Sequence, residues 1–393
     1  MSTQQTKQQT EASDYFKKFE IRKVKPQDIG ELKSFFIKVY GKDTIFQDKQ
    51  FLEWFFNPEQ NENHFMDNCL ICLNDNGKIV SFYGGLKCTL QIHDEKKPIV
   101  WGLNSFTLED WRGKGITSKM VEMFLENEIN GIIGFSREGA SFYKKIGYNI
   151  FNYKRFSRYI YILDDVKTQN MINYIKQDIQ KYQGIAKKTY NSKVQLSYQN
   201  VIKIDKSNIE DYNLCLDVGI AATTYRDKQF LNWRFIQNPF IDYDVYGFTE
   251  NNTICTYIAL RKEILSPLNY PVYRIIDLFG VSDHIPHLLN FIQTKAAFEN
   301  YIYIDFSKIG NLYTRELLTA GFFQLEEDDV AILPQVSSPV CYRPNNEYLG
   351  LKSLKHQQKI NLLTSDNIYF TRMDCDRDRL ANISQINQKG AIL

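Results

Sequence analysis

Two parts of the 393-residue chain show nearly the same pattern of apolar and polar residues. The aromatic-rich stretch DKQFLEWFFNP occupies residues 48–58, and DKQFLNWRFIQNP occupies residues 227–239. In the first copy Phe51, Trp54 and Phe55 fall on one face of a helix, and the Asn-Pro pair after each copy ends a helix. We interpret both stretches as amphipathic helices whose aromatic edge packs on a sheet.

The same order of elements follows each copy. Residues 68–88 and 243–263 each read as a strand, an Asn/Gly-type turn and a second strand. Three further pairs follow in order: apolar runs opened by proline at 98–108 and 271–281, helical stretches at 113–130 and 284–300, and strand-turn-helix segments at 131–148 and 301–323. This agreement in order and spacing predicts two copies of one α/β unit.

The chain is therefore expected to have five parts. They are a disordered tail at 1–13, a first domain at 14–165, a helical connection at 166–205, a second domain at 206–335, and a C-terminal extension at 336–393 with a frayed end. The tail is polar and carries no apolar core of a signal peptide.

Composition and net charge indicate which broad class of protein the chain belongs to. With 43% apolar residues, 24% charged residues and a net charge of +2, the chain is typical of a globular protein and shows no signal for nucleic acid or an anionic membrane. No apolar run approaches the ~20 residues of a membrane helix. Seven cysteines, an odd number set mostly in apolar strands, favour reduced thiols and a cytoplasmic protein. We expect a monomer or a homodimer.

No metal site is expected. Cys69 and Cys72 form a C-x-x-C without a second pair, so we interpret them as core thiols. His284 and His287 are interpreted as solvent-facing residues near a helix start. The alternating Asp374, Asp376 and Asp378 have calcium-like spacing but lack the glycine and distal glutamate of an EF-hand loop, which indicates a solvated turn.

The stretch EDWRGKGITSKM, residues 109–120, is the clearest candidate for a functional site in the sequence. It leads from a strand through a glycine turn into a helix, and the N–H groups at a helix N-terminus form an anion site, most naturally for a pyrophosphate. The candidate contacts are the close-approach glycines Gly113 and Gly115, the cations Arg112 and Lys114, and the hydroxyls of Thr117 and Ser118. The alternative is a surface turn with solvated basic residues. The dinucleotide and Walker fingerprints are both absent.

These residues resemble the GNAT-type N-acetyltransferase superfamily. Arg112 and Gly115 match its acetyl-CoA motif, [R/Q]-x-x-G-x-[G/A], with Thr117 where Gly or Ala is usual. The family's next motif is matched by GASFYKKIGY at 139–148, with Arg137 where an asparagine is common.

The resemblance implies an α/β fold: two tandem GNAT-like domains, each a mostly antiparallel mixed sheet flanked by helices. It also implies that acetyl-CoA lies between splayed strands. Its pantetheine would pair with backbone at Phe106, Thr107 and Leu108, and its pyrophosphate would rest on the turn from Arg112 to Ser118, Ile116 included.

The resemblance further implies direct attack of an amine on the thioester. Tyr143 would protonate the leaving thiolate. The strand before the turn offers Asn104 and Ser105 but no carboxylate, so the base is left open between water and Glu109.

The second copy departs from this chemistry. SDHIPHLLNF, at 282–291, has no glycine, arginine or lysine where the first copy has its turn, so this domain is expected to be degenerate and to bind substrate rather than CoA. Asp277 aligns with Asn104; it is either a hydrogen-bonded structural residue or a group that binds or deprotonates the amine. Tyr225, Arg226 and Arg234 are candidate substrate contacts.

The sequence thus favours an N-acyltransferase that moves an acetyl or other short acyl group to a small-molecule amine, with an amino sugar of surface-polysaccharide synthesis suggested by family resemblance alone. A protein or polyamine acetyltransferase is an alternative, and so is a non-catalytic CoA-binding scaffold. The low net charge argues against an aminoacyl-tRNA substrate.

Overall fold

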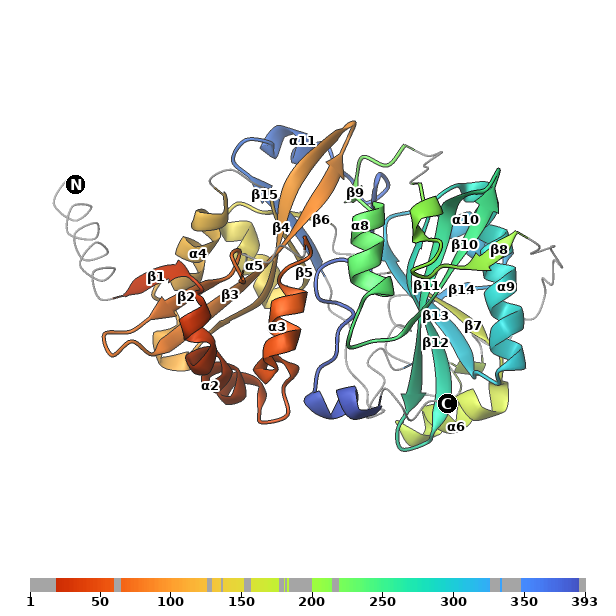
Figure 1. Ribbon diagram of the computed structural model, residues 1–393, viewed down its shortest axis with the longest axis horizontal. Coiled ribbons are helices and arrows are strands. Elements are labelled where there is room, and N and C mark those ends of the chain that lie inside the picture. Colours follow the sequence, from red (N-terminus) through yellow and green to blue (C-terminus); the bar gives the residue numbers. More distant parts are fainter. Residues whose placement is uncertain are drawn as a thin grey trace.

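The computed structural model of the chain describes residues 19–59, 65–125, 129–135, 137–151, 157–176, 180, 182–183, 200–213, 219–325, 333 and 348–388. The predicted tail at 1–13 lies outside these residues, as do the last five residues of the C-terminal extension. Figure 1 shows two lobes side by side, with the blue C-terminal part of the chain running between them.

The first unit contains β1 (Glu20–Lys23), η1 (Pro26–Asp28), α2 (Ile29–Tyr40), η2 (Ile45–Gln47), α3 (Lys49–Phe55), β2 (Leu70–Leu73), β3 (Ile79–Ile92), β4 (Glu95–Thr107), η3 (Glu109–Trp111), α4 (Ile116–Leu125), β5 (Ile129–Phe135), α5 (Arg137–Lys145) and β6 (Asn149–Phe151). The connection contains β7 (Ser157–Ile162) and α6 (Asp165–Tyr174).

The second unit contains β8 (Val201–Lys203), η4 (Ile209–Asp211), β9 (Ala222–Thr224), α8 (Lys228–Leu231), the π-helix η5 (Asn232–Ile236), β10 (Tyr243–Glu250), β11 (Thr253–Leu265), β12 (Tyr270–Phe279), η6 (Ser282–His284), α9 (Ile285–Phe298), β13 (Tyr303–Ile309), α10 (Thr314–Thr319) and β14 (Phe323–Leu325). The C-terminal part adds β15 (Tyr348–Ser353), α11 (Gln357–Asn361), β16 (Ile368–Thr371) and η7 (Ile383–Gln388).

The repeat predicted from the sequence is visible in the strand pairing. In the first unit β2, β3 and β4 are antiparallel neighbours, and β4 then pairs with β5 in parallel. In the second unit β10, β11 and β12 are antiparallel neighbours, and β12 pairs with β13 in parallel. A crossover helix joins each parallel pair, α4 in one unit and α9 in the other. The predicted mixed sheet flanked by helices is confirmed.

The two units exchange strands, which the predicted boundaries did not anticipate. β7, expected in the first domain, pairs with β13 and β14 of the second unit. β15, expected outside both domains, pairs with β5 and β6 of the first unit. Figure 1 shows this exchange: blue β15 lies in the red-to-yellow lobe and yellow-green β7 in the green-to-cyan lobe. Each exchanged strand satisfies the hydrogen-bonding edge of a strand that would otherwise lie open.

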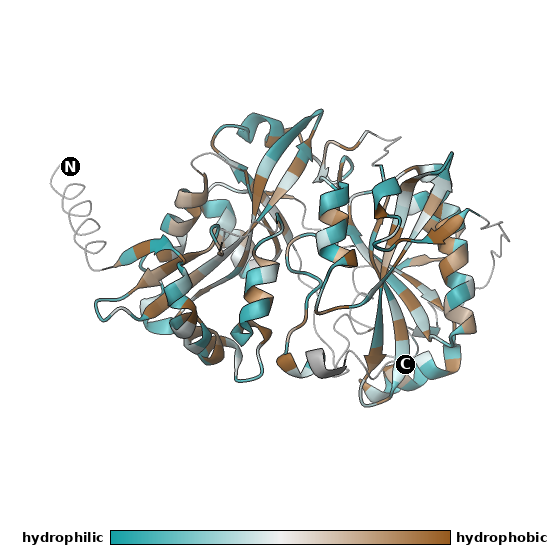
Figure 2. Cartoon of the chain, viewed as in Figure 1, coloured by the Kyte–Doolittle hydropathy of each residue, from teal (hydrophilic) through white to brown (hydrophobic). Residues whose placement is uncertain are grey.

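Two short strands join the units into one 16-stranded sheet. β9 pairs with the end of β3 on one side and with β16 on the other, and β16 continues to β13. Figure 2 shows hydrophobic stretches along the central strands, while helices such as α9 carry hydrophobic residues on one face and polar residues on the other. Cys69 and Cys72 are fully buried free thiols, as predicted.

The repeated motif forms the contact between the units. Asp48 and Asp227 each cap the helix that follows, because their carboxylates accept the backbone N–H of Phe51 and Phe230 at 2.8 Å. The two helices then bring Trp54 and Trp233 together, with ring centroids 5.6 Å apart. The indole N–H of Trp233 donates to the carbonyl of Trp54 at 3.2 Å. The duplicated aromatic edge therefore packs against its own copy as well as on the sheet.

A buried ion cluster ties the exchanged strand to the second unit. The carboxylate of Asp305 on β13 is fully buried and lies within 2.9 Å of three guanidinium groups, those of Arg158 on β7, Arg274 on β12 and Arg372 after β16. Burial opposes the charge of Asp305, but the three arginines outweigh it and hold the pKa of the carboxyl below its ordinary value. The Asp305 carboxylate thus binds three segments that lie far apart in the sequence.

Replacing Trp233 by alanine should lower the free energy of unfolding by about 3–5 kcal/mol, because the side chain is 1% exposed and fills the contact between the units. Urea denaturation followed by tryptophan fluorescence and circular dichroism measures the change. Phe298→Ala, an 86% exposed aromatic on α9, is the matched control and should change stability by less than about 0.5 kcal/mol. A loss below about 1 kcal/mol for Trp233→Ala would contradict the packing role.

Replacing Asp305 by asparagine should destabilise the protein by about 3–5 kcal/mol, because three buried guanidinium groups lose their shared carboxylate. The control is Glu53→Gln, which breaks the exposed Lys49–Glu53 pair of 2.7 Å and should cost about 0–1 kcal/mol. Equal stabilities of the two variants in denaturant titration would show that the cluster is not what holds β7.

Candidate active site

The candidate site begins where the parallel pairing of β4 with β5 ends. Their ladder runs from Ile99 opposite Ile129 to Gly102 opposite Ile132. β4 continues to Thr107 and β5 to Phe135 beyond that last rung. The final residues of β4 therefore remain paired with β3 but part from β5, which matches the splayed strands expected from the family resemblance.

A β-bulge lies directly after the last rung. Phe82 on β3 pairs with Phe106 and Gly84 pairs with Leu103, so Tyr83 faces both Asn104 and Ser105. Asn104 has a φ of +49°, a left-handed conformation that asparagine tolerates better than most residues. The bulge turns the backbone of β4 out of the regular pleat. The side-chain nitrogen of Asn104 is buried and has no hydrogen-bond partner among the described residues.

Tyr143 on α5 approaches this bulge. Its side chain is 6% exposed and its hydroxyl is hydrogen-bonded to Ser105, so the structure brings a predicted catalytic residue to the predicted polar pair of β4. Burial raises the pKa of the Tyr143 hydroxyl, against a smaller lowering by Ser105. The phenol therefore stays protonated at neutral pH, as a proton donor requires.

The glycine turn leads from η3 into α4 in the predicted way. Gly113 and Gly115 have φ values of +76° and +75°, where side chains with a Cβ are strained. A Cβ on Gly113 would meet no atom within 4 Å, so open space lies over the turn. Arg112 is exposed, and its Nε donates to the Thr107 carbonyl at 3.1 Å. The cation of the turn thus lies beside the end of β4.

Three of the predicted cofactor contacts are more restricted than expected. The Thr117 hydroxyl lies 3.3 Å from that of Thr107, so it turns back toward the sheet. This explains how threonine is tolerated where the family prefers a smaller residue. Ile116 is 2% exposed, which leaves only its backbone for a ligand. The N–H of Leu108 already donates to the Val80 carbonyl at 2.9 Å.

Asp277 does not face a groove. It is fully buried on β12, where Arg226 Nε donates to its carboxylate at 2.9 Å and the Thr371 hydroxyl donates at 2.8 Å. Arg226 is also fully buried. The hypothesis that Asp277 binds the amine and that Arg226 contacts substrate is therefore corrected: the two residues form a structural ion pair.

The other sequence candidates spread over the surface and the core. Arg234 is 1% exposed and donates to the Asp378 carbonyl at 2.7 Å, so it too is structural rather than a substrate contact. Tyr225 is half-buried under the ammonium of Lys96, 3.7 Å from its ring centre. Glu109 is exposed in η3. Of the predicted substrate and base candidates, the polar pair Asn104 and Ser105 lies at the bulge.

Sequence reasoning missed the part of the chain that covers the end of the ladder. The segment Asp374–Arg379, here called the C-terminal segment, brings the Cys375 thiol within 3.7 Å of the Gly102 carbonyl. It also places Arg379 Nη2 3.4 Å from Asn104 Oδ1. The alternating acids of this segment, assigned to a solvated turn, were the available signal: Asp374 and Asp378 are in fact buried, at 1% and 5% exposure.

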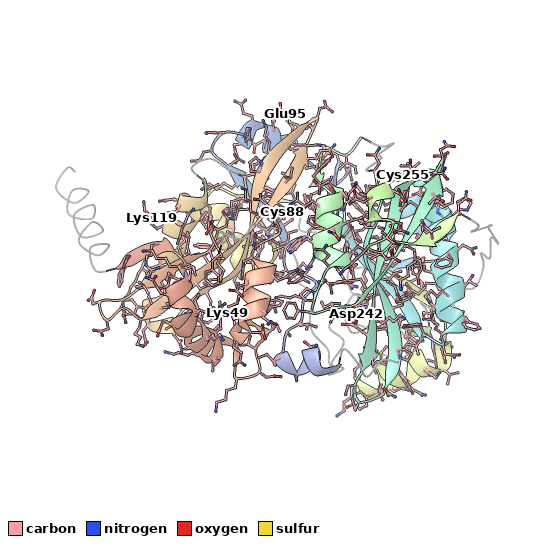
Figure 3. The ribbon with its side chains drawn as sticks, in the orientation of Figure 1. Lys49, Cys88, Glu95, Lys119, Asp242 and Cys255 are labelled. Carbon is pink, nitrogen blue, oxygen red and sulfur yellow. The ribbon has the colours of Figure 1, made fainter. Side chains whose placement is uncertain are left out.

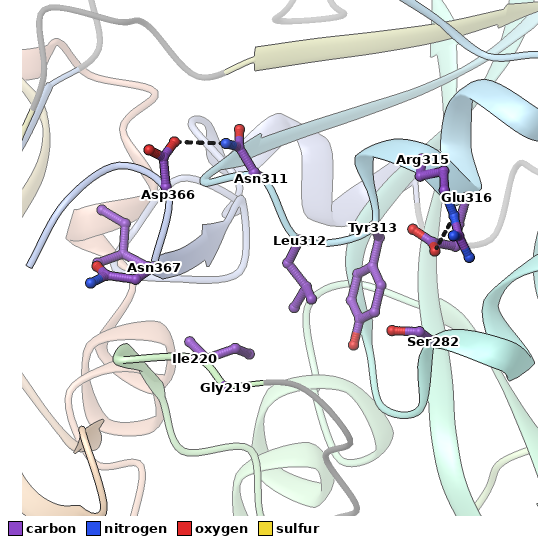
Figure 4. Close-up of a pocket in the computed structure, with 11 residues that line it drawn as sticks. Gly219, Ile220, Ser282, Asn311, Leu312, Tyr313, Arg315, Glu316, Asp366 and Asn367 are labelled. Carbon is purple, nitrogen blue, oxygen red and sulfur yellow. Dashed lines mark hydrogen bonds and ion pairs between the residues drawn. The ribbon is translucent and has the colours of Figure 1, made fainter.

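In the second unit, a tyrosine side chain occupies the position that corresponds to the end of β4. Gly280 aligns with Thr107, and the Tyr313 hydroxyl donates to its carbonyl at 2.5 Å and accepts its N–H at 2.9 Å. Tyr313 also lines a cavity of about 240 Å³ between η6, the start of α10 and Asp366. Figure 4 shows Tyr313 in this cavity, with Arg315, Glu316, Asn311 and Asp366 around it.

One group of potential metal ligands exists among the described residues: Glu250, Cys255 and His284, whose ligand atoms lie within 4.8 Å of one another. Figure 3 labels Cys255 in the second unit. The thiol faces His284 Nδ1 at 3.6 Å, whereas Glu250 faces Nε2 at 3.6 Å. Glu250 is exposed to solvent, and we propose no metal there. His284 is 8% exposed and stacks on Phe248, which corrects its expected solvent-facing position.

Comparison with known proteins agrees with the geometry of the first unit. Residues 20–151 match the family model of the acetyltransferase (GNAT) domain. A conserved protein of unknown function from Enterococcus faecalis V583, a probable N-acyltransferase, is similar in fold with a TM-score of 0.53 at 10% identity, over 87% of this chain and 74% of that one.

Two other solved structures resemble the chain more loosely. A GCN5-related N-acetyltransferase from Anabaena variabilis ATCC 29413 has a TM-score of 0.49 at 11% identity, covering 85% of this chain and 72% of that one. Saccharomyces cerevisiae N-myristoyltransferase with bound myristoyl-CoA has a TM-score of 0.47 at 10% identity, covering 85% and 82%. No curated protein matches the sequence.

Within the described part of the chain, no helix is both long and apolar enough to cross a bilayer. The parted strands, the bulge, the glycine turn and the matched family model all fall within the first unit. Residues 20–151 of the chain therefore form a GNAT acetyltransferase domain.

Proposed function

We propose that the first unit transfers an acetyl group, or another short acyl group, from acyl-CoA to a primary amine. The main support for the proposal is the close spacing of two features: the bulge at Asn104 on β4 and, eight residues on, the glycine turn from Arg112 to Gly115 that follows η3. A pyrophosphate on that turn and a thioester at that bulge suit the two ends of a pantetheine arm.

The turn would hold the diphosphate through the backbone N–H groups at the start of α4, aided by Arg112, Lys114 and Ser118. Arg112 must release the Thr107 carbonyl, to which it donates at 3.1 Å, before the pantetheine can pair there. Because this side chain is exposed, the rearrangement costs little buried contact.

At the bulge the nitrogen of a neutral amine attacks the thioester carbonyl. A C–N bond forms, and a backbone N–H near Phe106 or Thr107 stabilises the oxyanion. The C–S bond then breaks, and the Tyr143 hydroxyl protonates the departing thiolate. The unpartnered side-chain nitrogen of Asn104 is a candidate contact for the acceptor.

The second unit is proposed not to bind CoA. The start of α9 lacks glycine and cations, and Tyr313 occupies both backbone hydrogen-bonding groups of Gly280, which aligns with Thr107. Its proposed role is to hold the C-terminal segment against the first unit. For the acceptor we propose an amino sugar of surface-polysaccharide synthesis, on family resemblance alone; a polyamine and a protein amine are the rivals.

Acetyl-CoA should stabilise the protein against heat, and Gly113→Val with Gly115→Val should weaken its binding at least about tenfold, because valine resists a positive φ and covers the anion site. Isothermal titration calorimetry measures the affinity. Gly77→Val is a matched control, since Gly77 has a φ of +70° and equal open space but lies in the β2–β3 turn.

Unchanged affinity in the double valine variant would overturn the assignment of the turn. Free-thiol release with glucosamine, spermidine and a lysine peptide then separates an enzyme from a scaffold. Binding of acetyl-CoA without transfer to any amine would favour the scaffold.

Tyr143→Phe should lower kcat by roughly 10²–10⁴-fold while leaving acetyl-CoA affinity unchanged, because only the proton donor is removed. Thiol release under saturating acetyl-CoA measures it. Tyr148→Phe, which removes another buried hydroxyl of the same aromatic cluster, is the control and should keep near-normal turnover. Comparable loss in both variants would point to packing rather than proton transfer.

A further inference from the structure

The C-terminal segment reaches the first unit from the second. Cys375, with a φ of +61°, directs its thiol to the Gly102 carbonyl at 3.7 Å, and the backbone of Ile133 hydrogen-bonds the same sulfur. Gly102 and Ile133 stand on β4 and β5 at the point where their ladder stops. The segment therefore lies at the apex of the parted strands.

Two of its three acids fasten the segment to the second unit. Asp374 accepts from Arg226 Nη2 at 3.3 Å and from the backbone N–H of Thr371 at 2.6 Å. Asp378 accepts from Arg261 Nη1 at 2.7 Å and from the Tyr243 hydroxyl. Both carboxylates are buried in these contacts. They hold the intervening residues in place.

Asp376, between them, faces a different environment. The segment consists of turns, Cys375 has a left-handed backbone, and Asp376 does not share the buried partners of Asp374 and Asp378. Its Oδ2 lies 3.4 Å from Arg379 Nε, and that same guanidinium reaches Asn104 Oδ1 at 3.4 Å. Its side chain is 19% exposed, which leaves it open to solvent or a ligand.

Among the described residues, Arg379, Cys375 and Tyr40 are charged or titratable groups that face Asp376. Arg379 and Cys375 lie on its own segment, the latter with its sulfur 3.6 Å from Asp376 Oδ1. From α2 comes Tyr40, whose pKa is raised by burial and further by the Asp376 charge, with Arg379 acting in the opposite direction. The 3.4 Å separation between Asp376 Oδ2 and Arg379 Nε exceeds the about 2.7–2.9 Å of a strong charge-assisted bond, so this ion pair is a loose one.

The proposed transfer lacks a base on β4 itself. The strand has no carboxylate in its last nine residues, Ile99–Thr107, and Glu109 is exposed in η3. The C-terminal segment holds the Asp376 carboxylate against Arg379, whose guanidinium reaches Asn104 at the bulge. Cys375 of this segment packs on the side of the sheet that α2 and α3 cover, opposite to α4 and Tyr143. An amine approaching from that side would meet Asp376 while the thiolate leaves toward Tyr143.

We propose that Asp376 accepts the proton of the attacking amine, directly or through one water molecule. The inference rests on the proposed acyl transfer. As the C–N bond forms, the nitrogen becomes positively charged and its proton passes to the Asp376 carboxylate. The C–S bond breaks, and Tyr143 donates its proton to the thiolate. The products are an amide and CoA, and the two residues exchange the net proton with water.

The test compares Asp376→Asn, Asp376→Glu and the exposed control Asp75→Asn in thiol-release assays with acetyl-CoA and the best substrate among glucosamine, spermidine and a lysine peptide. Asp376→Asn should lose about 10²–10⁴-fold in kcat/KM for the amine. Its acetyl-CoA affinity and melting temperature should stay near those of the wild type. The glutamate variant should recover part of the rate, and Asp75→Asn all of it.

The pH profile separates catalysis from structure. With the base removed, the deficit of Asp376→Asn should shrink as pH rises, because hydroxide and free amine replace the carboxylate. A deficit constant with pH, or a parallel loss of acetyl-CoA binding, would overturn the role of Asp376. If the wild type is active and Asp376→Asn turns over at the same rate, the role of Asp376 is overturned but the proposed acyl transfer is not. A wild type that transfers to no amine overturns the proposed function, and this inference falls with it.

Discussion

The early end of the parallel pairing between β4 and β5 determines where the candidate site lies. β4 and β5 pair as far as Gly102 and Ile132, and the bulge at Asn104 then turns β4 away. Pairing with β3 holds the far edge of β4 in place, so the strand cannot simply follow β5. Backbone groups that a regular sheet would satisfy internally become available to a ligand or to another part of the chain. Tyr143 and the glycine turn are placed relative to this point.

The second unit holds the C-terminal segment against the parted strands of the first unit, but it has no glycine turn of its own. Strand exchange through β7 and β15, the Trp54–Trp233 contact and the charges around Asp305 make the two units one folded body. The same body positions the C-terminal segment, because Asp374 and Asp378 are held by arginines of the second unit. In a tandem repeat of this kind, one copy keeps the glycine turn. The other copy can position a chain segment on the side from which the proposed amine acceptor approaches.

Local pattern was enough to predict the order of elements in each copy and the glycine turn, because each depends on residues close together in sequence. Tyr143 was a candidate through the family resemblance, and the fold brings its hydroxyl to Ser105. Local pattern was not enough for the exchanged strands. An arginine such as Arg158 within the apolar run SRYIYI indicates a buried acid elsewhere, but periodicity cannot say that the acid is Asp305, 147 positions away. Asp277 shows the same limit: a carboxylate in an apolar strand fits both a groove and an ion pair, and only the fold brings Arg226 to it.

Hydrogen exchange of the backbone amides, with and without acetyl-CoA, tests whether the first unit binds the acyl donor. We expect new protection at the end of β4 and along the turn from Gly113 to Ser118, with none at Gly280 or the start of α9. Protection confined to the second unit, or no change anywhere, would contradict the assignment of the first unit as the site of acyl transfer.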